Sequence, residues 1–353
     1  MIRYRLTAAL FLAGAAVLGE TVRASDGPKS AAPASFRGKL VLFGAQRVPA
    51  ESGRVEILMM NPDGTALESL GTWKDVGRMT GRVSPDGRRL AFGIISADQK
   101  RWETWIRETD GRERKLPVDG VVRAWSPDGA SLACFRLKGD HVWESVRVEV
   151  ESGRVRPLPV PATEVVDDWA TDGALAVMNG NHGQTLDEPV KGVYPLRQIE
   201  VMALDGSRRQ RVTTDPLLDN IWSRFSPDGS RLAHEQRRVE PKTARVFCSY
   251  VVRRSDGSQS VEVVRRDRLD DDLHVVASYP SYPFYWDPAI VPCWSPDGSR
   301  LVVCLDNYSW TQRHGRDKWR WALVFVTLEG RIERTLDLTK KLGIVFVCEI
   351  DWK

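Results

Sequence analysis

Residues 294–303 read WSPDGSRLVV, and the tetrapeptide Ser-Pro-Asp-Gly inside this stretch recurs along the chain. Proline presets φ, aspartate caps the turn and glycine accepts a positive φ, so the tetrapeptide favours a tight hairpin. An aromatic or apolar residue precedes each copy, and a short strand-like run follows it. Four intact copies and one degenerate copy are present: Ser84–Gly87, Ser126–Gly129, Ser226–Gly229, Ser295–Gly298 and Ala170–Gly173.

A second series of turns lies between the copies of the first. Each member follows an alternating strand, such as Val55–Met60, and precedes another short strand, such as Arg331–Leu336. These turns end at Gly64, Gly111, Gly153, Gly206, Gly257 and Gly330. Successive glycines of the series are 47, 42, 53, 51 and 73 residues apart. A repeat near this length, with four strands per unit, is typical of a β-propeller.

The second series has six members and the first has five, and the missing hairpin lies where the chain begins and ends. Lys39–Phe43 has the pattern of a second strand without a first, and Val345–Trp352 has that of a first strand without a second. Pairing of the two ends in one blade closes the ring and removes two exposed sheet edges. The sequence therefore predicts an all-β, six-bladed propeller with four-stranded antiparallel blades, closed by the C-terminal strand.

These repeats resemble the WD40-like PD40 repeats of the TolB family, whose C-terminal domain is a six-bladed propeller. The resemblance covers residues 38–353 and the propeller module alone, since residues 25–37 are too few for the N-terminal α/β domain of that family. The resemblance implies an exported binding scaffold.

The N-terminal residues have the pattern of a signal peptide. Arg3 and Arg5 precede an apolar run, Leu6–Leu18, that is too short to span a bilayer. Small residues around Ala24 predict cleavage after it, which leaves residues 25–37 as a disordered leader. No other apolar stretch of the sequence is long enough to cross a membrane. We therefore expect a mature protein that is periplasmic or secreted.

Charge and cysteine content exclude some classes of function. Loss of residues 1–24 removes three positive charges and one negative charge, so the formal net charge falls from +4 to +2. No basic run stands out, which argues against nucleic-acid binding. The five cysteines lie in apolar runs without a CxxC pair, so we expect small buried side chains rather than a disulfide framework.

Motifs of catalysis are missing from the sequence. It has no GxSxG nucleophile elbow and no HExxH pair. The five histidines, His141, His182, His234, His274 and His314, are far apart in sequence. We therefore expect no catalytic residue, metal or cofactor. The alternative is a carbohydrate-active lyase or hydrolase, with the histidines gathered at a site in the central channel.

Long loops supply the candidate binding surface. In a four-stranded antiparallel blade both turn series lie on one face, so the long connections lie on the other. The loops 267–288 and 306–319 are long and rich in aromatic and basic residues, which suits a protein interface or stacking on a glycan. The alternative is a hydrophobic lid. The candidate binding residues are Tyr279, Tyr282, Tyr285, Trp286, Tyr308, Trp310, Arg313 and Trp319.

A second set of candidates lies on the inner strands. Each member stands one residue before the aromatic or apolar residue that precedes a Ser-Pro-Asp-Gly turn or, at the C-terminus, before Trp352. In blade order this position holds Asp351, Arg82, Ala124, Asp168, Arg224 and Cys293. Asp351 and Arg82 fall in neighbouring blades, and so do Asp168 and Arg224. The pattern predicts ion pairs between blades around a wet channel, with a ligand or cation site as the alternative. Together these features predict an exported, non-enzymatic scaffold that binds another protein of the periplasm or cell envelope.

Overall fold

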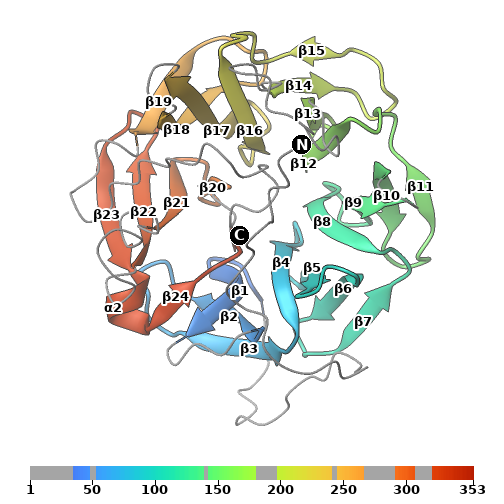
Figure 1. Cartoon of the computed structure of the whole chain (residues 1–353), viewed down its shortest axis with the longest axis vertical. Helices are drawn as coiled ribbons and strands as arrows, with labels where there is room; N and C mark the ends of the chain where they lie inside the picture. Colours follow the sequence, from blue (N-terminus) through green and yellow to red (C-terminus); the bar gives the residue numbers. More distant parts are fainter. Residues whose placement is uncertain are drawn as a thin grey trace, which may run out of the picture.

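The computed structural model describes residues 35–47, 53–138, 142–179, 197–240, 245–265, 291–306 and 320–353. These residues form six antiparallel sheets arranged as blades around a central axis, which confirms the predicted six-bladed propeller (Figure 1). The first blade contains β1 (Leu40–Arg47), β2 (Val55–Met60), β3 (Glu68–Trp73), β24 (Ile344–Phe346) and β25 (Glu349–Trp352).

Each of the other five blades has four strands that are consecutive in sequence. Blade two contains β4 (Val76–Val83), β5 (Arg89–Ser96), β6 (Trp102–Glu108) and β7 (Glu113–Leu116). Blade three contains β8 (Gly120–Trp125), β9 (Ser131–Leu137), β10 (Trp143–Glu149) and β11 (Val155–Pro157). Blade four contains β12 (Glu164–Trp169), β13 (Leu175–Asn179), β14 (Gln198–Met202) and β15 (Gln210–Arg211).

Blade five contains β16 (Leu218–Phe225), β17 (Arg231–Glu240), β18 (Arg245–Arg254) and β19 (Ser260–Arg265). Blade six contains β20 (Cys293–Trp294), β21 (Arg300–Asp306), β22 (Trp321–Thr327) and β23 (Ile332–Asp337). A short helix, α2 (Leu338–Leu342), follows β23, with Asp337 as its N-cap and Gly343 as its C-cap. Within the described residues, no helix is long and apolar enough to cross a membrane.

The inner strands are apolar on both sides because each blade packs between two others. All six residues of the inner strand β8 are buried, and so are all seven of β22, the third strand of blade six, a pattern expected for strands covered on both faces. The outer strands are more exposed, as in β15, where both residues are exposed. The apolar clusters therefore lie between blades, as where Val252 of β18 joins the cluster of Val324 of β22.

The Ser-Pro-Asp-Gly segments form tight hairpins between the first and second strands of their blades. In blade two, Ser84 Oγ donates to Asp86 Oδ1 at 2.5 Å, and the Arg88 N–H donates to the same oxygen at 3.0 Å. Gly87 has a φ of 71°, which glycine adopts without strain. The Thr109 N–H, in the outer turn of this blade, donates to the Arg88 carbonyl at 3.1 Å. Inner and outer turns therefore share one face of the disc, called here the turn face.

The ends of the chain complete the first blade, as predicted. β25 pairs with β1 from Leu40 opposite Trp352 to Phe43 opposite Glu349. The Gly38 N–H donates to the carbonyl of Lys353, so the segment before β1 meets the C-terminal residue on the turn face. The Trp352 ring packs edge-on against Phe325 of blade six, with ring centroids 5.9 Å apart.

The predicted strand Val345–Trp352 is not continuous in the structure. It divides into β24 and β25, with Cys348 between them and its N–H donating to the Phe43 carbonyl at 3.0 Å. The break lies opposite a bulge in β1 at Gly44, whose φ is 66°. A side chain at Gly44 would come within 2.6 Å of the Cys348 sulfur, so this glycine permits the close approach of the two strands.

Candidate binding cavity

A cavity of about 490 Å³ lies at the centre of the propeller, and all six blades contribute to its lining. Its rim consists of turn residues: Pro85, Pro127, Thr171, Pro227 and Pro296. Because these residues belong to the Ser-Pro-Asp-Gly series, the cavity opens on the turn face. Arg37, Gly38 and Lys353, where the two ends of the chain meet, also line it.

The walls of the cavity contain the aromatic residues that precede the turns, called here the anchors. Trp125, Trp169, Phe225, Trp294 and Trp352 line the cavity. The indole N–H of Trp125 donates to the Arg82 carbonyl of blade two at 3.1 Å, and that of Trp294 donates to the Arg224 carbonyl of blade five at 3.0 Å. Trp125 and Trp294 thus join neighbouring blades, and the anchors together present an apolar wall.

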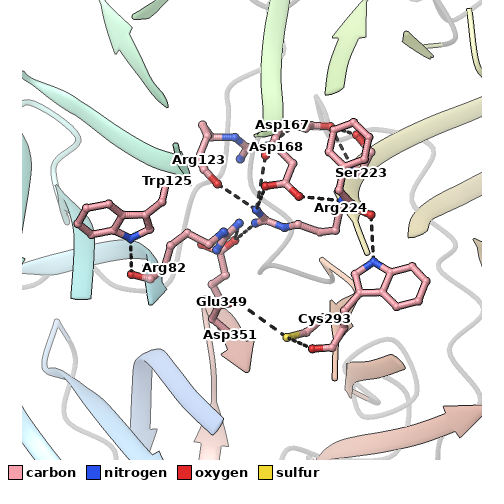
Figure 2. Close-up of polar contacts among 12 residues, drawn as sticks. Arg82, Arg123, Trp125, Asp167, Asp168, Ser223, Arg224, Cys293, Glu349 and Asp351 are labelled. Atoms are coloured by element: carbon pink, nitrogen blue, oxygen red, sulfur yellow. Dashed lines mark hydrogen bonds and ion pairs between the residues drawn. The ribbon is translucent and has the colours of Figure 1, made fainter. Parts of the chain in front are cut away.

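Two aspartates of the wall bind the backbone of the next blade. Asp351 Oδ2 accepts the N–H of Val83 at 2.7 Å, at what we call junction 1–2. Asp168 Oδ2 accepts the N–H of Phe225 at 2.8 Å, at what we call junction 4–5. Figure 2 shows both aspartates among the polar side chains of the channel. Carboxylates of one blade therefore fix the inner strand of its neighbour.

A second pair of carboxylates also accepts backbone N–H groups of the next blade. These two lie further along the inner strands, away from the turn face. At junction 1–2, Glu349 Oε2 accepts the Gly81 N–H at 2.9 Å. At junction 4–5, Asp167 Oδ2 accepts the Ser223 N–H at 3.0 Å. Glu349 is 2% exposed and Asp167 is 0% exposed, so both carboxylates are inside the protein.

Buried arginines surround these two carboxylates and form a charge network across the channel (Figure 2). Glu349 forms ion pairs with Arg82 and with Arg224, whose Nη2 lies 2.9 Å from Glu349 Oε1. Asp167 forms an ion pair with Arg123. Arg224 Nη1 also donates to the Arg123 carbonyl at 2.9 Å. We call Arg82, Arg123, Asp167, Arg224 and Glu349 the charge network; its Arg82 and Arg224 form part of the cavity lining.

The structure brings the predicted channel residues Arg82, Asp168, Arg224 and Asp351 together around one cavity. Arg224 Nη1 lies 3.7 Å from Asp168 Oδ1, as an ion pair between neighbouring blades. Arg82 forms its ion pair with Glu349, and the Asp351 carboxylate binds a backbone N–H. Sequence reasoning missed Glu349 because it searched one position per blade. The signal was a lone carboxylate inside the apolar run Ile344–Ile350.

Burial raises the pKa of two cavity groups. Desolvation raises the pKa of Asp168 to about 6, although the Phe225 N–H and the Arg82 charge oppose this shift. Burial also raises the pKa of the Cys293 thiol, and Cys293 Sγ lies 4.0 Å from Asp351 Oδ1. Such a thiol is poorly reactive. All five cysteines are buried, as expected.

Metal ligands do not gather in the part of the chain that the structure describes, where no group of three His, Cys, Asp or Glu side chains could hold an ion. His234 of β17 is fully buried, and Arg253 Nε donates to its Nε2 at 3.3 Å. Desolvation and the Arg253 charge lower the pKa of His234 to about 3, so this ring is neutral and structural. His141, His182, His274 and His314 lie outside the described residues.

The predicted binding loops also lie outside the described residues, so their role stays a prediction. This applies to Tyr279, Tyr282, Tyr285, Trp286, Tyr308, Trp310, Arg313 and Trp319. The same holds for the signal peptide, residues 1–24, and for most of the leader, residues 25–37.

No protein-family model matches the sequence, and no curated protein matches it either. Solved structures do match the fold. TolB from Acinetobacter baumannii matches with a TM-score of 0.62 and 16% identity, over 91% of this chain and 67% of that chain. A chain of a nidogen/laminin complex matches with a TM-score of 0.53 and 13% identity, over 89% of this chain and 98% of that chain. These likenesses establish a TolB-like β-propeller fold, and function has to be argued from the site.

Proposed function

We propose that this chain is a non-enzymatic scaffold, exported to the periplasm or secreted, whose central cavity binds a segment of another protein of the cell envelope. The observation that carries the proposal is the cavity itself. It opens on the turn face, has aromatic walls from neighbouring blades and is lined in part by arginines of the charge network. Its volume of about 490 Å³ lies within the range of ligand pockets in proteins.

The composition of the cavity favours a protein ligand. Aromatic residues and arginines carry much of the binding energy at protein interfaces. Here Trp125 and Trp294 stand in the walls, while Arg37 and Lys353 stand near the opening. A partner that inserts an apolar side chain between the anchors would contact both kinds of group.

The hydrogen bonds of the cavity favour binding over chemistry. One oxygen of Asp168 and one of Asp351 are committed to backbone N–H groups of the next blade. Arg82 and Arg224 are committed to Glu349. Groups held in this way stay in place when a ligand arrives, so little ordering is needed on binding.

A carbohydrate-active hydrolase is the second candidate, and one observation favours it. Asp168, with a pKa of about 6, shares the cavity with Asp351, and glycosidases use one carboxyl group as an acid and another as a base or nucleophile. Release of reducing sugar from a panel of bacterial polysaccharides, lost in Asp168→Asn, would support this candidate over the scaffold.

Affinity capture tests the scaffold. The mature protein, residues 25–353, is used to capture partners from its own cell envelope, and these are identified by mass spectrometry. Thr171 is exposed at the rim, so Thr171→Trp should narrow the opening without changing the fold. We expect this variant to lose the captured partner and to keep the parent's circular dichroism.

Two further variants locate the contact. Arg88→Gln with Ser299→Ala changes the turn face outside the cavity lining, and this pair should retain the partner. Trp286→Ala with Trp310→Ala changes the predicted loops. Loss of the partner in the loop variant, with full retention in Thr171→Trp, would move the site from the cavity to the loops.

A further inference from the structure

The charges of the cavity are unequal. Four basic side chains line it, Arg37, Arg82, Arg224 and Lys353, against two acidic side chains, Asp168 and Asp351, and the terminal carboxylate of Lys353. A cavity with walls of low dielectric concentrates the field of such groups and attracts ligands of opposite sign.

The basic groups near the opening are available to a ligand. Arg37 is exposed, and its Nε donates to the backbone carbonyl of Asp86 at 3.0 Å. Lys353 is partly exposed. Among the described residues, no side-chain carboxylate lies within ion-pair distance of Arg37 or of the Lys353 ammonium group. Both can therefore pair with an acidic group of a ligand without breaking an existing ion pair.

The deeper basic groups are incompletely neutralised. Arg82 and Arg224 both approach one oxygen of the same carboxylate, Glu349 Oε1. Asp168 stands 3.7 Å from Arg224, beyond hydrogen-bond distance. Two guanidinium groups that share one carboxylate oxygen retain part of their positive field, which extends towards the cavity that both residues line.

The two acidic residues of the wall weaken this field but do not reverse it. Asp351 Oδ2 and Asp168 Oδ2 each accept a backbone N–H, which disperses part of their negative charge. Burial also favours the neutral form of Asp168, whose pKa is about 6. The charged groups near Asp168 are Arg82 and Lys353, which act on its pKa, and Arg224, with which it pairs.

We infer that the cavity selects an acidic, carboxylate-bearing segment of the partner, with carboxylates near Arg37 and Lys353 and an apolar side chain against the tryptophan anchors. This inference rests on the proposed function and adds the chemical class of the ligand. The field of Arg82 and Arg224 below would hold the segment in the cavity rather than at the rim.

A random dodecapeptide library displayed on phage tests the inference with residues 25–353 as the target. Binders that Thr171→Trp fails to retain are cavity binders. If Thr171→Trp lowers the thermal midpoint, Thr171→Gln serves as a smaller change at the same rim position. We expect the cavity binders to be enriched in Asp and Glu over the unselected library, and their affinity to fall as salt rises.

One enriched peptide is then compared with its amide analogue, in which Asn and Gln replace each Asp and Glu. By fluorescence anisotropy, the amide analogue should bind about tenfold more weakly, since each partly exposed ion pair adds a modest contribution. Arg37→Gln with Lys353→Gln should weaken the acidic peptide by a similar factor and leave the amide analogue unchanged. The matched control, Arg88→Gln with Arg331→Gln, removes two basic residues that do not line the cavity and should change neither.

The possible failures are distinguishable. Cavity binders enriched in Lys and Arg, or equal affinity for the acidic peptide and its amide analogue, would overturn the inference and leave the proposed function standing. A library without a single binder sensitive to the rim variants would overturn the proposed function, and the inference with it.

Discussion

Junction 1–2 and junction 4–5 make the same contact with different sequences. In each, two carboxylates of one blade accept two backbone N–H groups of the next. At junction 1–2 the carboxylates are Glu349 and Asp351, which are two residues apart. At junction 4–5 they are Asp167 and Asp168, which are adjacent. The difference in spacing has a structural cause.

Side chains two residues apart on a regular strand point to the same side, so Glu349 and Asp351 both reach blade two without distortion. Adjacent residues point to opposite sides. At junction 4–5 the register of β12 shifts between Val166 and Asp168, and this bulge directs both aspartates towards blade five. Regular alternation in β25 and a bulge in β12 therefore have the same result: each directs two carboxylates of one blade towards the backbone of the next.

The two junctions also carry different amounts of charge. Glu349 forms ion pairs with two arginines, Arg82 of blade two and Arg224 of blade five. Asp167 forms an ion pair with Arg123 and accepts hydrogen bonds from Ser223. The strand β25, which carries both carboxylates of junction 1–2, also closes the ring by pairing with β1. We therefore expect junction 1–2 to be the more sensitive of the two to mutation.

Deletion of residues 345–353 should have the largest effect. It removes β25, most of β24 and the carboxylates of junction 1–2, and it exposes the edge of β1. We expect loss of the cooperative thermal transition, measured by circular dichroism at the β-sheet band. A deletion variant that unfolds cooperatively at the parent's midpoint would show that the ring does not depend on this strand.

Glu349→Gln should have the next largest effect. It leaves Arg82 and Arg224 buried without their shared carboxylate, and breaking a buried pair from one side costs about 3–5 kcal/mol. Asp167→Asn leaves only Arg123 without its carboxylate, so its cost should lie at the lower end of this range. Urea unfolding measures both variants.

The control for this pair is Glu151→Gln. Glu151 pairs with Arg89 at 3.3 Å but is 83% exposed, so its loss should cost less than about 1 kcal/mol. Equal costs for Glu349→Gln and Asp167→Asn would contradict the proposed difference between the junctions.

Much of the fold could be predicted from sequence because its signals are local. Pro85, Asp86 and Gly87 specify a turn by their own backbone preferences, and this turn recurs at regular spacing. The incomplete hairpin at the chain ends predicted which strands close the ring. The split of the last strand at Cys348 was not predictable, since it depends on a bulge at Gly44, some 300 residues away in sequence.

The candidate site was only partly predictable because its contacts join distant blades. A search one residue before each anchor found Asp168 and Arg224, which lie 3.7 Å apart. It assigned Asp351 to an ion pair, whereas this carboxylate binds the Val83 N–H. The search took one position per blade, so it missed Glu349, which lies two residues before Asp351 on the regular strand β25. It also missed Asp167, which the bulge at junction 4–5 directs towards blade five.

Asp168→Asn should change how stability depends on pH. The pKa of Asp168 is about 6 in the folded protein and 3.8 without burial, so the folded state holds the proton more tightly. Stability should therefore fall as pH rises from about 4 to about 6, by roughly 3 kcal/mol for this group. Asp168→Asn keeps an oxygen for the Phe225 N–H and should remove this fall, as measured by urea unfolding at pH 4.5 and 7.

The turn aspartates give a control when the same measurement is extended below pH 4. The Ser295 hydroxyl holds the pKa of Asp297 at about 2, so the stability that this group adds is lost only as pH falls below about 4. The stability that depends on Asp168 falls as pH rises from about 4 to about 6, whereas the stability that depends on Asp297 falls as pH drops below about 4. A pH profile between 4.5 and 7 that is the same in Asp168→Asn and the parent would show that burial does not perturb Asp168.

The smallest effect should be the coupling between Asp168 and Arg224. A double-mutant cycle on Asp168→Asn and Arg224→Met isolates their interaction from the cost of each single change. Arg224 has two closer partners, Glu349 Oε1 at 2.9 Å and the Arg123 carbonyl at 2.9 Å, whereas Asp168 Oδ1 lies at 3.7 Å. We therefore expect a coupling of about 0.5–1 kcal/mol by urea unfolding, with Arg224→Met alone costing far more. Coupling above about 2 kcal/mol would mean that Asp168, rather than Glu349, is the main partner of Arg224, and junction 4–5 would then equal junction 1–2 in charge.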